Sequence, residues 1–211
     1  MRASRLAIMA EILITNTRPE YIPQLVELQI TCYPTLADTS RLKKPHFESH
    51  LRIFPEGQWV ALDSERVVGM SAGFLCTFDF DHPHHTFDEI IDYGFFTRHD
   101  PRGKHFYGAD VSVHPDYRGR GIARRLYDAR KVLVRGRGLQ GIVTGAMIPG
   151  FADYKSIMDA QTYVSRVVAG EIFDPTLSVQ LRQGFRVRGL LPNYLPDTAT
   201  DGWSVLIEWV P

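Results

Sequence analysis

The spacing of apolar and polar residues changes along the chain, and these changes divide it into expected strands and helices. Apolar and polar side chains alternate over residues 11–17, a pattern typical of a strand with one buried face. Two longer apolar runs, residues 58–62 and 66–78, are separated by a short polar Asp-Ser-Glu turn, which predicts a β-hairpin. Further strands are expected at residues 107–113, 141–147, 185–190 and 203–209.

Helical spacing is strongest over residues 121–134, where one face carries Ile122, Leu126, Ala129 and Leu133. Other helices are expected at residues 19–32, 47–54 and 160–169, and in a segment that follows Asp174-Pro175 and ends before Gly184. Hairpin strands come first and strand–helix alternation follows. The order predicts an α/β (α+β) fold in a single domain over residues 1–211, with residues 1–8 as an unstructured extension if Met9 is the true start.

Composition and charge exclude several classes of protein. The 211 residues include 24 basic and 24 acidic side chains, so no net field attracts the chain to nucleic acid or to a membrane surface. No apolar run approaches the roughly 20 residues that span a bilayer. The two cysteines, Cys32 and Cys76, lack metal-ligand spacing and are expected to be free thiols, which favours a cytoplasmic protein.

Gly-Arg-Gly occurs twice, and context separates the two copies. Gly136-Arg137-Gly138 follows an expected helix and precedes a strand, so it is interpreted as a helix C-cap, where the negative end of the dipole repels phosphate. Gly119-Arg120-Gly121 follows a strand and opens a helix, so its N–H groups can converge on a phosphate. It has neither P-loop nor Rossmann spacing, which indicates a phosphate ligand held without a metal. The alternative is an ordinary strand–turn–helix junction.

The residues around this copy resemble a known family. "VSVHPDYRGRGIA" is similar to motif A of the GNAT acetyltransferases, whose Gln/Arg-x-x-Gly-x-Gly/Ala signature falls on Arg118, Gly121 and Ala123. The order of elements from Glu11 to Trp209 also fits that family. The resemblance implies a mixed, mainly antiparallel, twisted sheet of about seven strands flanked by helices. It also implies an N-acetyltransferase that transfers the acetyl group of acetyl-CoA to an amine of a small molecule or peptide.

The same resemblance implies where acetyl-CoA binds. Its pyrophosphate is expected on the backbone N–H groups of Arg118, Gly119, Arg120, Gly121, Ile122 and Ala123. Its pantetheine arm is expected along the backbone of Val111, Ser112 and Val113. Arg120, Arg124 and Arg125 are candidates to meet the 3′-phosphate.

Within the superfamily the chain is most similar to GNAT domains fused ahead of nitrilase-type carbon–nitrogen hydrolases. The segments "YGADVSVHPDYRGRGIARRLYDARK", "IPGF" and "LRQGFRVRGLLPNYLPD" carry this likeness. Since the sequence contains no hydrolase domain, we expect a free-standing relative that works beside an amidohydrolase of the nitrilase type.

Acetyl transfer needs a base for the amine and an acid or other stabilisation for the CoA thiolate. Asp110 is the candidate base, because a carboxylate in an apolar strand is costly unless it is paired or used. The alternative is a structural Asp110 that bonds a loop or pairs with an arginine. Many GNAT enzymes have a tyrosine four residues before the Gly-Phe that closes the late helix. Gln180 stands there in this chain, which leaves Tyr163 or Tyr154 as substitutes and keeps open a second function, a CoA-binding module with little catalysis.

The remaining candidate chemistry lies in two irregular segments. The first, residues 79–105, contains His82, His84, His85 and His99, whose spacing matches no zinc pattern, so no metal site is predicted. Residues 79–105 and 148–173 are where we expect recognition of the acceptor, since loops on a rigid scaffold usually carry specificity. Exposed apolar loops are also compatible with a homodimer.

Overall fold

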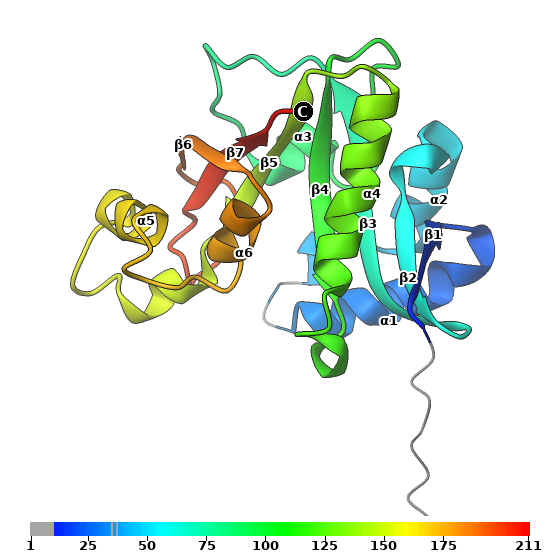
Figure 1. Cartoon of the computed structure of the whole chain (residues 1–211), viewed down its shortest axis with the longest axis horizontal. Coiled ribbons are helices and arrows are strands. Elements are labelled where there is room, and N and C mark those ends of the chain that lie inside the picture. Colours follow the sequence, from blue (N-terminus) through cyan, green and yellow to red (C-terminus); the bar gives the residue numbers. More distant parts are fainter. Residues whose placement is uncertain (1–10, 35, 37) are drawn as a thin grey trace, which may run out of the picture.

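The fold is built on one seven-stranded sheet with the order β1-β2-β3-β4-β5-β7-β6 (Figure 1). The computed structural model describes residues 11–34, 36 and 38–211; the expected extension over residues 1–8, with Met9, lies outside them. The strands are β1 (Leu13–Asn16), β2 (Trp59–Asp63), β3 (Arg66–Cys76), β4 (His105–Val113), β5 (Gly141–Met147), β6 (Arg186–Leu191) and β7 (Ser204–Trp209). Only the β4–β5 pair is parallel. The expected mixed, mainly antiparallel sheet is therefore confirmed.

Helices cover both faces of this sheet. They are α1 (Ile22–Cys32), α2 (Lys44–Ile53), α3 (Phe87–Ile91), α4 (Ile122–Gly136), α5 (Ala160–Val168) and α6 (Leu177–Arg182). On one face α4, α5 and α6 pack a core that contains Leu126 and Phe106. On the other face α1 and α2 pack a second core that contains Leu25 and Tyr107. Side chains in the middle of β4 therefore face one or the other of two separate cores.

Three elements differ from the sequence expectation. Helix α2 begins at Lys44, before the expected start at residue 47, and β4 begins at His105. The segment expected to be irregular, residues 79–105, contains the short helix α3, which begins with a capping box. There the Thr86 side chain accepts from the Glu89 N–H while the Glu89 carboxylate accepts from the Thr86 N–H.

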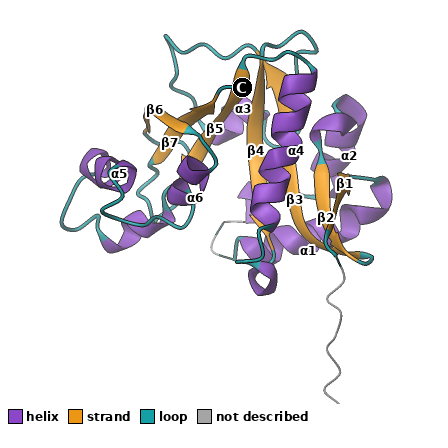
Figure 2. Ribbon diagram, in the orientation of Figure 1, coloured by secondary structure: helices purple, strands orange, loops and turns teal. Residues whose placement is uncertain are grey.

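The strands β4 and β5 pair over a short length and then separate. His105–Tyr107 pair with Gly141–Val143, and no further β4–β5 pairs follow in the described residues. Figure 2 shows the two strands diverging below this point. The Thr144 hydroxyl donates to the Gly108 carbonyl at 2.6 Å where they part. From Gly108 to Val113, β4 is paired on the β3 side only, which leaves one backbone edge open.

A β-bulge lies at the start of this open edge. Ala72 of β3 pairs with Asp110, whereas the next residue, Gly73, pairs with Gly108, so Ala109 is an extra residue in β4. A bulge increases the local twist of its strand. It therefore helps to turn β4 away from β5 while β4 remains paired to β3.

The second Gly-Arg-Gly copy closes α4, as expected. Helix α4 ends at Gly136, and Gly138 has a φ of 62°. The Leu139 N–H donates back to the Val134 carbonyl at 3.0 Å. The C-cap interpretation is confirmed. Over the described part of the chain, no helix combines the length and apolar character needed to cross a bilayer.

Candidate active site

The first Gly-Arg-Gly copy forms an open turn ahead of α4. Gly119 and Gly121 have φ angles of 75° and 74°, in the left-handed region that favours glycine. A Cβ built on either glycine meets nothing within 4 Å, and no side chain caps the helix. Ile122 and Ala123 are the first residues of α4, so their N–H groups lack intrahelical acceptors. The turn thus has the space, the free donors and the positive dipole end that an anion requires.

One of the expected backbone donors is already used. The Arg118 N–H donates to the Pro115 carbonyl at 3.2 Å, and the Arg118 side chain donates through Nε to the Val113 carbonyl at 3.2 Å. Arg118 therefore fixes the turn against the end of β4. The backbone N–H groups expected to hold pyrophosphate are then those from Gly119 to Ala123.

The three arginines expected near a 3′-phosphate surround this turn but differ in how they are held. The Arg120 guanidinium donates to the Asp116 carbonyl at 3.0 Å and lies 4.6 Å from the centre of the Tyr117 ring. Arg125 donates to the Ile12 carbonyl at 2.6 Å. Arg124 makes only an exposed 3.9 Å ion pair with Asp128, so it is the arginine most readily redirected to a ligand.

Asp110 is buried on the α1 side of β4 and is fixed through both carboxylate oxygens. Its Oδ2 accepts from Gln29 Nε2 at 2.6 Å, and its Oδ1 accepts from the Tyr33 hydroxyl at 2.7 Å. Burial raises the pKa of Asp110 above its usual value, although both hydrogen bonds act against that rise. The carboxylate is therefore bonded by Gln29 of α1 and by Tyr33 just beyond its end, and the charge of Arg130 on the other face also favours its ionised form. These contacts suit a structural carboxylate as well as a base.

Sequence reasoning missed Gln29 and Tyr33 as part of this site. Gln29 lies on the apolar stripe of α1 and is 3% exposed, so its position was a signal, because a buried amide needs a partner. Tyr33 follows the end of α1 and gave no such signal. Cys32 also lies near Asp110, and burial raises the pKa of its thiol to about 11, which leaves the thiol protonated at neutral pH.

A fully buried arginine supports the bulge from the opposite face. Arg130 of α4 donates through Nε to the Ser71 hydroxyl at 2.6 Å and through Nη2 to the carbonyls of Ala72, at 2.8 Å, and of Asp110. A Cβ on Gly108 would lie 2.5 Å from Arg130 Nη1, so any larger residue there would displace the guanidinium. Burial lowers the pKa of Arg130 to about 10, and the guanidinium remains charged at neutral pH. A cation thus lies under the point where β4 and β5 part.

Gln180, which stands where many relatives have tyrosine, faces a phenol from another helix. Gln180 Nε2 donates to the Tyr127 hydroxyl of α4 at 3.1 Å, and both side chains are buried. Of the substitutes considered above, Tyr163 donates to Asp174 Oδ2 at 2.9 Å. Asp174 in turn accepts from backbone N–H groups at the start of α6. Tyr154 packs against the Tyr163 ring, with 5.4 Å between ring centres.

Two histidines of the first irregular segment, His85 and His99, bond to other parts of the fold. His85 Nε2 bonds the Tyr107 hydroxyl at 2.8 Å, and His99 Nδ1 accepts from the Leu75 N–H at 3.1 Å. Within the described ranges, no group of three or more potential ligands is placed to hold a metal ion.

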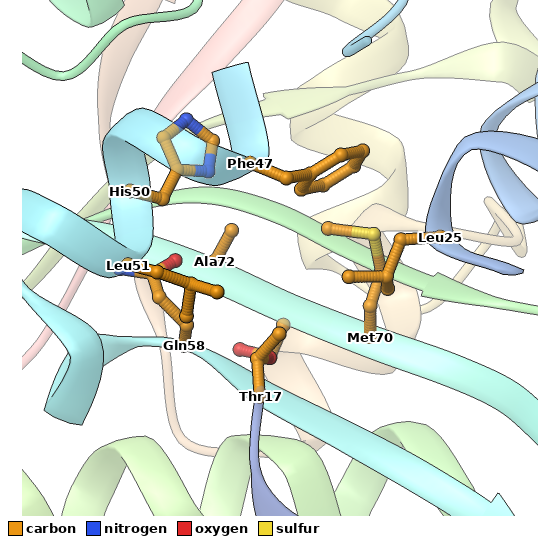
Figure 3. Close-up of a pocket in the computed structure, with 9 residues that line it drawn as sticks. Thr17, Leu25, Phe47, His50, Leu51, Gln58, Met70 and Ala72 are labelled. Atoms are coloured by element: carbon orange, nitrogen blue, oxygen red, sulfur yellow. The ribbon is translucent and has the colours of Figure 1, made fainter. Parts of the chain in front are cut away.

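Two hollows lie away from these residues. One is a cavity of about 10 Å³ between α1, α2 and β3, with His50 and Gln58 in its wall (Figure 3). Its volume suits about one water molecule and no part of a coenzyme. The other hollow is a groove of about 660 Å³ between α1 and α2, lined by residues such as Ile22 and Lys44. Neither includes a residue of the phosphate turn or of β4.

Comparison with known proteins gives consistent matches. Residues 22–148 match the model of the "Acetyltransferase (GNAT) family". The chain is 33% identical to the "Uncharacterized N-acetyltransferase YkwB" of Bacillus subtilis (strain 168), over 93% of this chain and 87% of that protein. It is 40% identical to the "Probable hydrolase YhcX" of the same organism, over 94% of this chain and 38% of that protein, so it spans well under half of that relative. A solved structure described as a GNAT-like decarboxylase, GphF, in complex with isobutyryl-CoA superposes with a TM-score of 0.77 at 21% identity, covering 94% of this chain and 98% of GphF.

Proposed function

Because the chain belongs to the GNAT family of acetyltransferases, we propose that it transfers the acetyl group of acetyl-CoA to an amine of a small molecule or peptide by direct attack. One observation carries this proposal. The open edge of β4 is joined by one short 3-10 turn, Pro115–Tyr117, to the open phosphate turn, so neighbouring stretches of backbone offer sites for the pantetheine arm and the pyrophosphate.

Acetyl-CoA fits this stretch by its chemistry. The N–H groups from Gly119 to Ala123 would hold the pyrophosphate, and the edge at Val111, Ser112 and Val113 would pair with the amides of pantetheine. The solved neighbour bound to isobutyryl-CoA supports a CoA thioester as ligand of this fold. When bound, the thioester supplies an activated acyl group.

Asp110 is the proposed base for the amine. Its two hydrogen bonds to Gln29 and Tyr33 fix the carboxylate on the α1 side of β4, the side from which the amine would approach. Burial raises its pKa above the ordinary value of a carboxyl group, which strengthens it as a proton acceptor. Its carbonyl is held separately by Arg130, so the backbone and the side chain of this residue are both fixed.

The direct test combines calorimetric titration of acetyl-CoA and CoA with release of free thiol across a panel of amines. Gly121→Trp should abolish binding, because the indole would fill the phosphate turn, whereas Asp110→Asn should retain binding and lose turnover. Binding without thiol release for every amine would favour the alternative, a CoA-binding module. An acyl-CoA decarboxylase would release carbon dioxide and no thiol, so the assay also separates that activity. Absence of binding to either CoA species would refute the proposal.

The proposal extends to setting and partners. We place a single catalytic domain in the cytoplasm, since Cys32 and Cys76 are free thiols. Likeness to part of a probable hydrolase supports an amidohydrolase of the nitrilase type as a partner. Exposed apolar side chains such as Val132 and Val168 support a homodimer. Light scattering of the protein alone and mixed with such a hydrolase tests both associations.

A further inference from the structure

The second half of the reaction requires a proton on sulfur, and Gln180 stands at the position where many GNAT enzymes have a tyrosine to supply it. When the amine displaces CoA, the sulfur takes the electrons of the C–S bond as a thiolate. Gln180 has no acidic proton to give. The following inference rests on the proposed function and identifies the missing acid.

The side chain of Gln180 contacts the phenol of Tyr127, which belongs to a different helix. Tyr127 projects from α4, and its oxygen lies 3.1 Å from Gln180 Nε2 on α6. Since the amide donates in this contact, the phenolic oxygen accepts, and its own proton has no recorded acceptor among the described residues. The other atom of the amide, Gln180 Oε1, is buried without a hydrogen-bond partner there, so a hydrogen-bonding position is left open beside the phenol.

Tyr127 lies on the opposite side of β4 from the proposed base. It belongs to the core under α4 and α6 and packs edge-on against Phe185, with 5.6 Å between ring centres. Asp110 instead faces α1. A thioester held between β4 and β5 would thus meet its amine and its proton donor from opposite sides.

The charges that face Tyr127 suit a donor. Arg130 of the same helix lies with its guanidinium 5.7 Å from the ring centre, and Asp110 of β4 also contributes, whereas Gln180 and Phe185 are neutral. Burial raises the pKa of Tyr127, so the phenol carries its proton at neutral pH. The adjacent guanidinium stabilises the phenolate, or a thiolate, once the proton has moved.

We propose that Tyr127 is the catalytic acid and donates its phenolic proton to the CoA sulfur as the C–S bond breaks. The amine nitrogen forms the new bond to the acetyl carbon and gives its proton to Asp110. The sulfur leaves with the bonding pair and takes the proton of Tyr127. Asp110 then loses its proton to water and the phenolate regains one from water, so the enzyme returns to its starting state.

A binding cycle tests the contact without knowledge of the acceptor. CoA and desulfo-CoA are titrated calorimetrically into the wild type and into Tyr127→Phe. A hydrogen bond between the hydroxyl and sulfur predicts that the substitution weakens CoA binding by about two- to tenfold and leaves desulfo-CoA binding unchanged. Equal effects on both ligands would overturn the proposal, because they would show a role in packing alone.

Two matched tyrosines serve as controls, since each loses only a hydroxyl. Tyr163→Phe removes a buried bond to Asp174 and should affect the two ligands equally. Tyr33→Phe removes the bond to Asp110 on the other face, and sulfur-specific weakening in this variant alone would assign the acid to Tyr33 and overturn the proposal. Absence of binding of either ligand to the wild type would instead refute the proposed function, and the inference with it. With an accepted amine, Tyr127→Phe should also lower kcat by about a hundredfold or more with little change in KM.

Discussion

Replacement of Arg130 by methionine should remove much of the stability of the fold. Methionine keeps an apolar stem beside the rings of Phe106 and Tyr127 but donates no hydrogen bond. The substitution leaves the carbonyls of Ala72 and Asp110 without their buried donor. Each buried carbonyl that loses its partner costs about 1–3 kcal/mol, and the Ser71 hydroxyl loses a further bond, so the expected loss is about 3–5 kcal/mol. That is a large part of the roughly 5–15 kcal/mol that stabilises a typical domain.

Urea denaturation at neutral pH measures this loss. The control is Arg124→Met on the same helix, because Arg124 is exposed and makes only a 3.9 Å ion pair. It should change the free energy of unfolding by less than about 0.5 kcal/mol. If Arg130→Met unfolds within about 1 kcal/mol of the wild type with an unchanged denaturant slope, the guanidinium does not support the bulge in the way described.

Three further predictions concern the same regions. Gly108→Ala should destabilise the protein by about 1–3 kcal/mol and weaken CoA binding, because the added Cβ would lie 2.5 Å from Arg130 Nη1. Thermal unfolding measures the first effect and calorimetry the second. Unchanged values in both would contradict the close approach. Folding raises the pKa of the Asp110 carboxyl above 3.8, so the contribution of this group to the free energy of unfolding falls as the pH rises through the folded-state pKa. The stability of Asp110→Asn relative to wild type should therefore improve from about pH 4 to pH 7. A relative decline over that range would show that the pKa shift has the opposite sign. Burial lowers the pKa of His50 from 6.5 to about 3, so this group should reduce the free energy of unfolding by about 2 kcal/mol at pH 5. In urea titrations, the stability of His50→Gln should therefore fall less steeply toward acid pH than that of the wild type. An equally steep fall would place the acid sensitivity in another group.

Local signals explain why much of the fold could be predicted from the sequence. The hairpin of β2 and β3 has an apolar run on each side of a polar turn, and the two Gly-Arg-Gly copies are separated by the order of strand and helix around them. Helix α3 could have been found from the Thr86-x-x-Glu89 capping box, a signal that was overlooked. These features depend on residues that are neighbours in the chain.

The site depended on contacts that spacing does not encode. Tyr127 and Gln180 are 53 positions apart, and they meet only because α4 and α6 cover the same face of the sheet. Gln29 reaches Asp110 across 81 positions. Arg130 bonds the carbonyls of the Ala72–Asp110 pair beside the bulge, and a bulge that results from register leaves no periodic signature in an apolar strand. Sequence analysis could therefore nominate Asp110 and the phosphate turn, and could mark Gln29 as a buried amide, but it could not identify which residues these groups contact.

The short β4–β5 pairing divides the sheet mechanically into two plates. Strands β1 to β4 form one plate and β5 to β7 the other, and backbone pairing joins them over only three residue pairs. Such a seam can act as a hinge, because changing the angle between the plates costs few hydrogen bonds. An extended ligand that pairs with the free edges of both β4 and β5 would restrict motion at this hinge. The coenzyme arm would then hold the two parts of the sheet at a fixed angle as well as take part in the reaction. Its release after each turnover would let that angle change again before the next molecule binds.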